Sequence, residues 1–207
     1  MVNLNKVELK KKGQVINLTK NNNQGLGEIL VNLNWNQQGS GKKGFFGSLL
    51  GKSNRVDLDL GCLVSMKNGA KGAIQALGNS LGSYQSFPFI ELDGDDRTGA
   101  SAGGENLRIN GNKITEIDRV LVFAFIYEGV ANWSQADGIV TLKYPNGADI
   151  EVKLDEHRNG QKMCAIAMIE NVNNETFKVE RLVEYFDGHQ SMDRAYGWGM
   201  NWVAGKK

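Results

Sequence analysis

The chain has 207 residues, a length at which one domain can bury a core without disulfides or a structural metal. Its 24 Lys and Arg residues nearly cancel its 23 Asp and Glu residues, which argues against a general attraction to nucleic acid or to an anionic membrane. The sequence contains neither a signal-peptide core nor an apolar run near the roughly 18 residues of a transmembrane segment, so we expect a cytoplasmic protein.

Apolar side chains at every second position dominate the chain, which is typical of half-buried strands. Residues 27–35 (GEILVNLNW) show this alternation. Residues 55–64 (RVDLDLGCLV) show it again, with Asp57 and Asp59 on the face opposite the apolar residues. Residues 118–129 (DRVLVFAFIYEG) are apolar on both faces, as expected of a central strand in a sandwich.

Two later pairs of apolar segments have the spacing of β-hairpins. Residues 138–144 and 148–154 flank a Pro-Asn-Gly turn, and residues 163–172 and 175–186 flank an Asn-Asn pair. A helix is expected at most as a short piece over 70–77. About ten strands at this spacing predict an all-β fold, a two-sheet antiparallel β-sandwich with long acidic and Gly/Lys-rich loops.

We expect one domain over 1–207, with a Gly- and Lys-rich loop insertion at 36–54 and a frayed tail at 203–207. Cys62 and Cys164 lie far apart in apolar runs and belong to no CxxC pair. They are therefore predicted to be small core hydrophobes and not metal ligands or a redox pair.

The acidic, Gly-rich segment 93–112 is the main candidate site. The predicted metal ligands are Asp57, Asp59, Asp93, Asp95, Asp96, Glu105 and Asn106. Carboxylates at this density repel one another unless water or a cation compensates them, and Ca²⁺, which takes 6–8 oxygen ligands, suits them better than Mg²⁺. The segment is not an EF-hand, because Arg97 occupies a ligand position and Gly104 the twelfth position. The alternative is an acidic loop that is simply solvated.

These residues also carry a family resemblance. The motifs RVDLDLGCLV, ELDGDDRTG and GGEN resemble those of the TerD/TerA family of tellurium-resistance stress proteins, and the C-terminal part from YPNGADIEVKL onward is closer to the TerA branch. The resemblance extends from about Gly27 to Trp202. It implies a cytoplasmic, calcium-binding β-sandwich linked to tellurite and general stress resistance, without an established catalytic activity.

By position, the resemblance places the family's acidic residues on the two strand aspartates, on Asp95 and Asp96, and on Gly104, Glu105 and Asn106. The last of these segments holds fewer carboxylates here than in typical members. The number of calcium ions therefore stays open.

Other motifs are weaker candidates. Residues 47–53 (GSLLGKS) resemble a phosphate loop but are one residue short and precede a strand instead of a helix. Residues 45–50 (FFGSLL) are better interpreted as an exposed hairpin tip that either contacts a partner protein or a membrane surface, or folds back on the domain. His157 is expected in a solvated turn. The aromatic residues Tyr196, Trp198 and Trp202 are expected to close the core instead of forming a stacking platform.

The sequence thus predicts a calcium-binding, non-enzymatic stress-response protein associated with tellurite resistance. Metal-ordered loops and protein partners would carry its action. The expected partners are other tellurium-resistance proteins, with the inner face of the membrane as one place of assembly, and neither nucleic acid nor a transmembrane segment is expected. The alternative is a structural or scaffolding interaction module without a functional metal site. An enzyme using the metal as a Lewis acid lacks an evident base.

Overall fold

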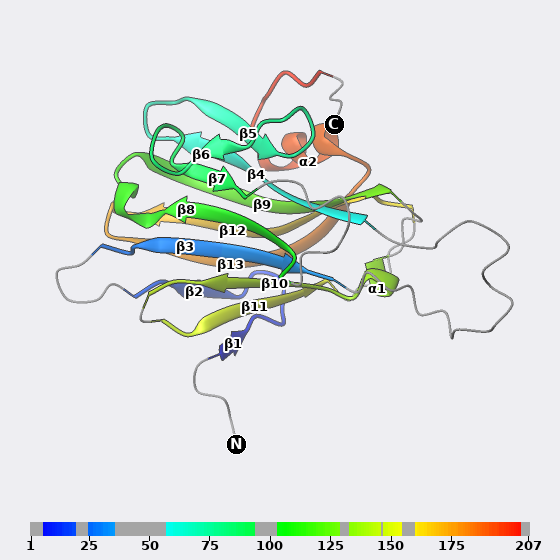
Figure 1. Cartoon of the computed structure of the whole chain (residues 1–207), viewed down its shortest axis with the longest axis horizontal. Helices are drawn as coiled ribbons and strands as arrows, with labels where there is room; N and C mark the ends of the chain where they lie inside the picture. The colour runs from blue at the N-terminus through cyan, green and yellow to red at the C-terminus, as the bar shows by residue number, and fades with distance from the viewer. Residues whose placement is uncertain are drawn as a thin grey trace, which may run out of the picture.

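The computed structural model describes residues 6–19, 25–35, 57–93, 103–128, 133–145, 147–154 and 160–203. Within these ranges thirteen strands form two sheets that face each other (Figure 1). Sheet A has the order β1 (Lys6–Glu8), β11 (Asp149–Leu154), β10 (Gly138–Lys143), β3 (Glu28–Asn34), β8 (Glu105–Asn110), β7 (Ile90–Leu92) and β6 (Gly82–Ser83). Sheet B has the order β2 (Val15–Asn17), β13 (Thr176–Phe186), β12 (Met163–Val172), β9 (Ile117–Glu128), β4 (Asp57–Met66) and β5 (Lys71–Gln75).

The predicted all-β, two-sheet sandwich is confirmed. The strand pairs of both sheets are antiparallel except that of β1 with β11, which is parallel. The exception arises at the N-terminal side, where β1 joins the edge of sheet A and the chain then crosses to the edge of sheet B as β2. The expected loop insertion at 36–54 lies outside the described residues, and of the expected tail only Val203, which is exposed, is described.

The main core lies between the sheets and follows the alternation seen in the sequence. In β9, Val122 and Ala124 face this core, whereas Phe123 and Phe125 belong to a second buried cluster on the outer face of sheet B. The central strand is therefore buried on both sides, as predicted. Cys62 and Cys164 are buried and are not joined in a disulfide, which confirms their interpretation as core residues.

Both predicted hairpins are present, as β10–β11 and β12–β13. In the second hairpin Asn173 and Asn174 have φ angles of 56° and 60°, the left-handed conformation that a tight two-residue hairpin turn requires and that Asn tolerates.

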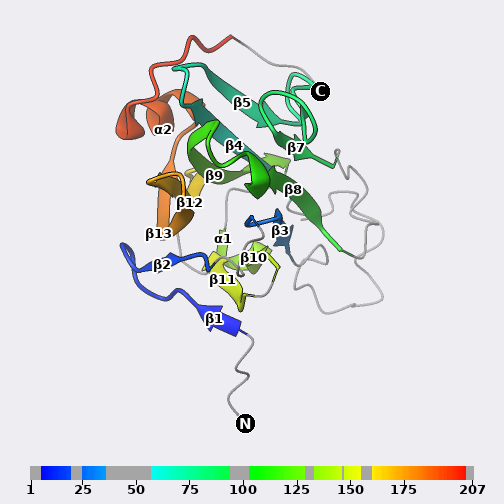
Figure 2. The same cartoon turned by 90° about the vertical axis from the view of Figure 1, so that its left-hand side faces the viewer.

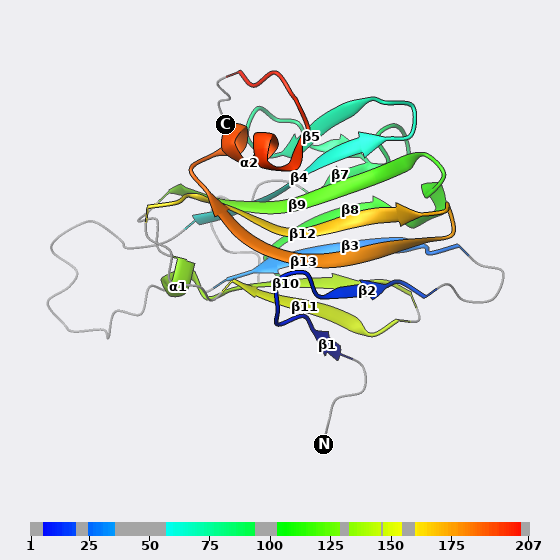
Figure 3. The same ribbon diagram turned by 180° about the vertical axis from the view of Figure 1, so that it is seen from behind.

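The prediction of a short helix over 70–77 was wrong. Residues 71–75 form the edge strand β5, because they pair with Gly61–Ser65 of β4. The eight-residue helix α2 (His189–Tyr196) was missed, since two turns are too short to show a clear apolar period. It lies on the side of sheet B away from sheet A (Figures 2 and 3). One turn of helix, α1 (Trp133–Ala136), and the 3₁₀ turn η2 (Gly111–Lys113) complete the described elements. None of the described helices has the length and apolarity that crossing a membrane requires.

Candidate functional site

Glu105, the first residue of β8, links the two sheets at one end of the sandwich. Its side chain lies on the same face of β8 as that of the core residue Leu107 and therefore points toward sheet B. The residue is only 3% exposed, and its Oε2 accepts a hydrogen bond of 2.6 Å from the backbone N–H of Leu60 in β4. A carboxylate is thus held in the interior beside a strand of the opposite sheet.

Gly104 determines how the chain enters β8. Its φ is +71°, and a Cβ there would lie 2.0 Å from the carbonyl oxygen of Leu33, so no other residue fits without moving the backbone. The close approach follows from the register, in which Leu33 of β3 pairs with Glu105. The glycine therefore allows the buried carboxylate to follow directly after the turn.

Asp59 brings a second buried carboxylate to the same stretch of β4. The sequence placed Asp57 and Asp59 on the face of β4 away from the core, and Asp59 does lie opposite the core residues Leu58 and Leu60. That face is not open to solvent, because Asp59 pairs with Phe125 of the second buried cluster and is fully buried. Asp59 and Glu105 thus lie next to Leu60 from different sides of β4.

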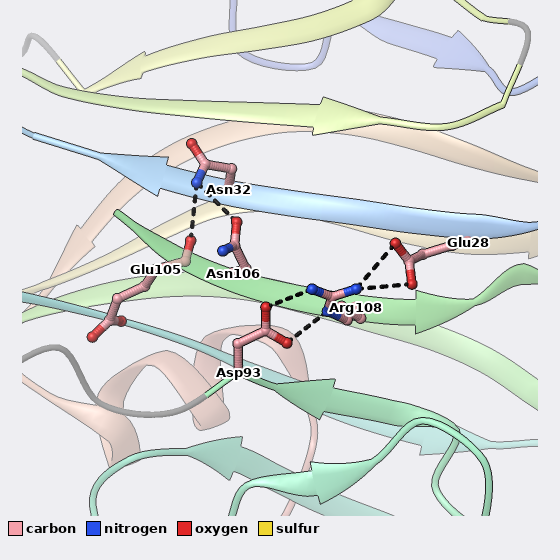
Figure 4. A network of polar contacts seen from close by, with 6 residues as sticks. All are labelled: Glu28, Asn32, Asp93, Glu105, Asn106 and Arg108. Carbon is pink, nitrogen blue, oxygen red and sulfur yellow. Dashed lines mark hydrogen bonds and ion pairs between the residues drawn. The ribbon is translucent and has the colours of Figure 1, made fainter. Parts of the chain in front are cut away.

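Asp93 has a different environment from the one predicted for a metal ligand. Arg108 of β8 donates to both of its carboxylate oxygens, from Nε to Oδ1 at 2.6 Å and from Nη2 to Oδ2 at 2.9 Å (Figure 4). The same guanidinium reaches Glu28 of β3 at 3.3 and 3.4 Å. The hydrogen bond to Asp93 and the negative charge of that carboxylate raise the pKa of Arg108 above its ordinary value. We call these three residues the Arg108 network.

Asn106 also lies on the outer face of sheet A. Its Oδ1 accepts a hydrogen bond of 2.9 Å from Nδ2 of Asn32, which also donates to the carbonyl of Gly103 (Figure 4 shows the two asparagines). The N–H of Asp93 in turn donates to the carbonyl of Asn106 at 2.9 Å. Asp93 and Gly103, the described residues on either side of segment 94–102, are therefore both anchored to sheet A.

The predicted ligands thus fall into three groups. Asp57, Asp59 and Glu105 are carried by the strands that meet near Leu60, and Asp93 and Asn106 lie on the outer face of sheet A. Asp95 and Asp96 lie outside the described residues. In the described ranges no three His, Cys, Asp or Glu side chains are grouped so that they could hold a metal ion. The metal site therefore stays a prediction.

Arg108 and Asn32 were missed from the sequence. Arg108 occupies an outward position in β8, and it pairs with Glu91 in β7 and Leu30 in β3. The alternation of polar and apolar residues over 105–110 is visible in the sequence, but the partners of Arg108 follow only from the register of three strands.

His189 and the aromatic residues near the C-terminus pack against other side chains in the described part of the chain. His189 contacts the rings of Phe123, Phe125 and Trp202, and its Nε2 lies 2.7 Å from Oε1 of Gln75. Burial lowers the pKa of His189 to about 4, so the ring is neutral at pH 7. His157 and the phosphate-loop-like residues 47–53 lie outside the described residues.

Trp198 is fully buried, and its indole N–H donates to the carbonyl of Val64 at 3.2 Å. Arg119 lies over its ring at 4.0 Å from the centroid. The aromatic residues after β13 thus complete the second buried cluster instead of presenting an open stacking surface, which agrees with the interpretation from the sequence.

Comparisons with known proteins found a domain family and a related sequence that match this chain. Residues 6–176 match the TerD domain family. The Tellurium resistance protein TerA of an Alcaligenes species is 47% identical over 206 residues. This match covers 100% of the present chain but 60% of the relative, so the chain spans about 60% of that protein's length.

Two solved structures share the fold. A homologue of the telluride resistance protein TerD from Streptomyces coelicolor A3(2) superposes with a TM-score of 0.54 at 16% identity. A protein described as of unknown function superposes with a TM-score of 0.58 at 13% identity. Each match covers 82% of this chain and 95% of the other. At these identities the likeness concerns the fold alone.

Proposed function

The chain belongs to the TerD domain family, and on that premise we propose that it binds Ca²⁺ where β8 meets β4, as a non-enzymatic protein of tellurite resistance and the stress response. It acts in the cytoplasm, through metal-ordered loops and through contacts with other tellurium-resistance proteins. The inner face of the membrane is one place for this assembly.

The observation that carries the calcium proposal is the pair of buried carboxylates next to Leu60. Asp59 is fully buried and Glu105 is 3% exposed. Burial raises the cost of ionising each carboxyl group, and a divalent cation close to the group offsets that cost. The donor atoms are all oxygens, which favours a hard ion such as Ca²⁺ over Zn²⁺ or copper.

The residues of this chain have separate roles in the proposed site. Asp57, Asp59 and Glu105 would hold the ion from the strands, with Asp95 and Asp96 as the predicted ligands from segment 94–102. Bound Ca²⁺ would supply positive charge that ties this segment to β4. Asp93 and Asn106 support the same site from outside. Arg108 holds Asp93 at one end of the segment, and Asn32, which also bonds Asn106, holds Gly103 at the other end.

Calorimetric titration of Ca²⁺ into the chelator-stripped full chain tests this function, with Mg²⁺ as the competing ion. We expect saturable binding at micromolar or lower concentration, together with a calcium-dependent rise in melting temperature. Glu105→Gln keeps the size of the side chain and removes its charge, and we expect at least about tenfold weaker binding. Asp118→Asn, a change of a half-exposed acid paired with Lys67, is the matched control and should bind as the wild type does. Absence of both heat and thermal stabilisation would contradict calcium binding.

The role in tellurite resistance needs a separate test in cells. A strain lacking this protein should regain growth on tellurite when it carries the wild-type gene and should regain less with Glu105→Gln at equal protein level. Equal rescue by both genes would separate the resistance from the proposed calcium site.

One observation favours the alternative of a scaffolding module without a functional metal. Arg108 already compensates Asp93, and Asn32 fixes Gly103, so protein contacts alone hold both ends of segment 94–102. A scaffolding module would capture its partner proteins equally well in calcium and in chelator. The proposed function predicts that chelation lowers this capture.

A further inference from the structure

The turn between β1 and β2 displays three consecutive lysines, Lys10, Lys11 and Lys12, in a fixed conformation. Oε1 of Gln14 accepts hydrogen bonds from the backbone N–H of Lys10 at 2.9 Å and of Lys11 at 3.4 Å. The N–H of Gln14 donates to the carbonyl of Lys11 at 3.0 Å, and Gly13 closes the turn with a φ of +77°. The lysine turn, residues 10–14, is therefore a built feature of the fold.

The lysine turn is separate from the proposed calcium site. It passes from sheet A to sheet B, since β1 is the edge strand of one sheet and β2 the edge strand of the other. Strands β11, β10 and β3 lie between β1 and β8 in sheet A (Figure 2). A ligand at the turn would leave the β4–β8 end untouched.

Arg181 of β13 lies directly beside the lysine turn. Its carbonyl accepts a hydrogen bond of 2.8 Å from the N–H of Gly13, and its N–H donates to the carbonyl of Gln14 at 3.0 Å. In sheet B it pairs with Ala167, a member of the core between the sheets, so the Arg181 side chain points into the sandwich. Arg181 is 6% exposed, and its Nε is buried without a hydrogen-bond partner.

The charges around the turn leave two cations without an acidic partner among the described residues. Lys10 is 3.5 Å from Glu8 and Lys12 is 3.1 Å from Glu184. Neither Lys11 nor Arg181 forms an ion pair with the side chains that the structure describes. Glu184 belongs to the outer face of β13, where it bonds Tyr196, and it is directed away from the Arg181 side chain.

We propose that Lys11 and Arg181 form a binding site for a phosphate-type oxyanion at the side of the sandwich. A buried guanidinium without a counter-charge is costly, and an anion removes that cost. The planar guanidinium can donate to two oxygens of one phosphate, and a lysine ammonium supplies a second point charge. The two positive charges match a phosphate group, which carries about −1.5 to −2 at pH 7. The phosphate is either free or part of a phosphomonoester, and the recognising chemistry is the same.

Titration of inorganic phosphate into the full-length chain by calorimetry tests the proposal, with sodium chloride at equal ionic strength as the reference. We expect saturable binding and a phosphate-dependent rise in melting temperature of about 2–4 °C near saturation. Phosphate also stabilises proteins through exclusion from their surface, so the variants decide the result. Arg181→Met keeps the length of the buried stem and removes the charge, and it should abolish the saturable binding.

Lys11→Gln and Lys113→Gln form a matched pair of exposed lysine variants. Lys113 lies in η2, away from the lysine turn. We expect about tenfold weaker phosphate binding in Lys11→Gln and unchanged binding in Lys113→Gln. Because Lys11 is exposed, its variant tests the proposal even if Arg181→Met does not fold. The proposal is overturned if wild-type protein binds no phosphate, or if Lys11→Gln binds it as the wild type does.

Vesicles distinguish the two sources of the phosphate. Cosedimentation with vesicles containing phosphatidic acid, whose headgroup is a phosphomonoester, and its loss in Lys11→Gln would assign the site to a lipid-borne phosphate. Saturable binding of free phosphate without this cosedimentation would assign it to a soluble anion. Equal cosedimentation with phosphatidylserine vesicles, unchanged in Lys11→Gln, would show general charge attraction and contradict the site.

Discussion

Arg108 of β8 holds the carboxylate of Asp93, at the end of β7, through two parallel hydrogen bonds of 2.6 and 2.9 Å. This bidentate geometry uses both carboxylate oxygens and compensates the charge of the aspartate. An acidic residue that looks like a metal ligand in the sequence is thus an anchor for the start of segment 94–102 in the fold.

Asp93 and Glu105 should respond differently to removal of their charge. Because Arg108 occupies both oxygens of Asp93, we expect Asp93→Asn to change the calcium affinity by less than about twofold. Glu105→Gln should weaken it at least about tenfold. Calorimetric titration of both variants compares them directly. If Asp93→Asn weakens binding as much as Glu105→Gln does, Asp93 is a ligand that Arg108 releases when the metal binds.

Gly104 and Gly103 provide a matched test of the turn before β8. Gly104→Ala should destabilise the protein by more than about 2 kcal/mol, because the new Cβ would clash with the Leu33 carbonyl at a positive φ. Gly103→Ala should stay within about 0.5 kcal/mol, because nothing lies within 4 Å of its added Cβ. Urea unfolding of the two variants measures both values. Equal stability of the two would contradict the register of β3 with β8.

His189 predicts a pH-dependent loss of stability between about pH 6.5 and pH 4. Burial lowers the pKa of His189 to about 4, whereas an unfolded histidine has a pKa of about 6.5. Between these values the unfolded chain binds a proton that the folded chain does not, so the free energy of unfolding falls as the pH falls. The loss reaches at most about 3 kcal/mol and stops below the folded pKa.

Thermal unfolding from pH 7 to pH 4 in the wild type and in His189→Gln measures this contribution. The variant should show a flatter profile in that range, because its amide does not titrate. His157→Gln is the control, and its profile should follow that of the wild type. Parallel profiles of wild type and His189→Gln would show that His189 does not cause the loss.

We expect the side chain of Asp193 to hold the segment after α2 in its conformation. Its carboxylate accepts hydrogen bonds from the N–H of Gly199 at 2.6 Å, the N–H of Met200 at 2.9 Å and the indole of Trp202 at 2.8 Å. Burial alone would raise the pKa of Asp193, but these three hydrogen bonds together lower it below its ordinary value. Its stabilising effect is therefore present at neutral pH and is lost as the pH falls through the folded pKa.

In Asp193→Asn an amide N–H₂ replaces one acceptor and faces these donors. We expect a loss of roughly 2–3 kcal/mol and a weaker near-ultraviolet circular dichroism signal from the tryptophans. Asp187→Asn, a change of an exposed acid just before α2, is the matched control and should leave both unchanged. An intact signal in Asp193→Asn would mean that ring packing alone holds the segment.

Much of the fold could be predicted because alternation records which face of each strand is buried. The doubly apolar β9, the hairpin at Asn173 and Asn174, and the buried cysteines all follow from local patterns. The edge strand β5 could not, because its strand conformation depends on pairing with β4 and its own sequence shows no strong period. Helix α2 is too short for its apolar residues to show a helical repeat.

The candidate site was predicted as a set of residues but not as an arrangement. The sequence identified Asp59 as facing away from the core, yet only the packing of the second cluster on sheet B shows that this face is buried. In the same way Asp93 and Glu105 were both predicted as metal ligands. The register of β7, β8 and β3 gives one a guanidinium partner and directs the other into the interior.

The sequence by itself determined the sandwich, its central strand and the family, because strand periodicity and short motifs are local properties of the chain. The tertiary structure alone decided which carboxylates are buried, which are compensated, and that Arg181 lies beside the lysine turn. These features depend on which residues, distant in the chain, share a register or face each other across the sheets. Electrostatic energies follow from that proximity and from burial, and neither is encoded in any single segment.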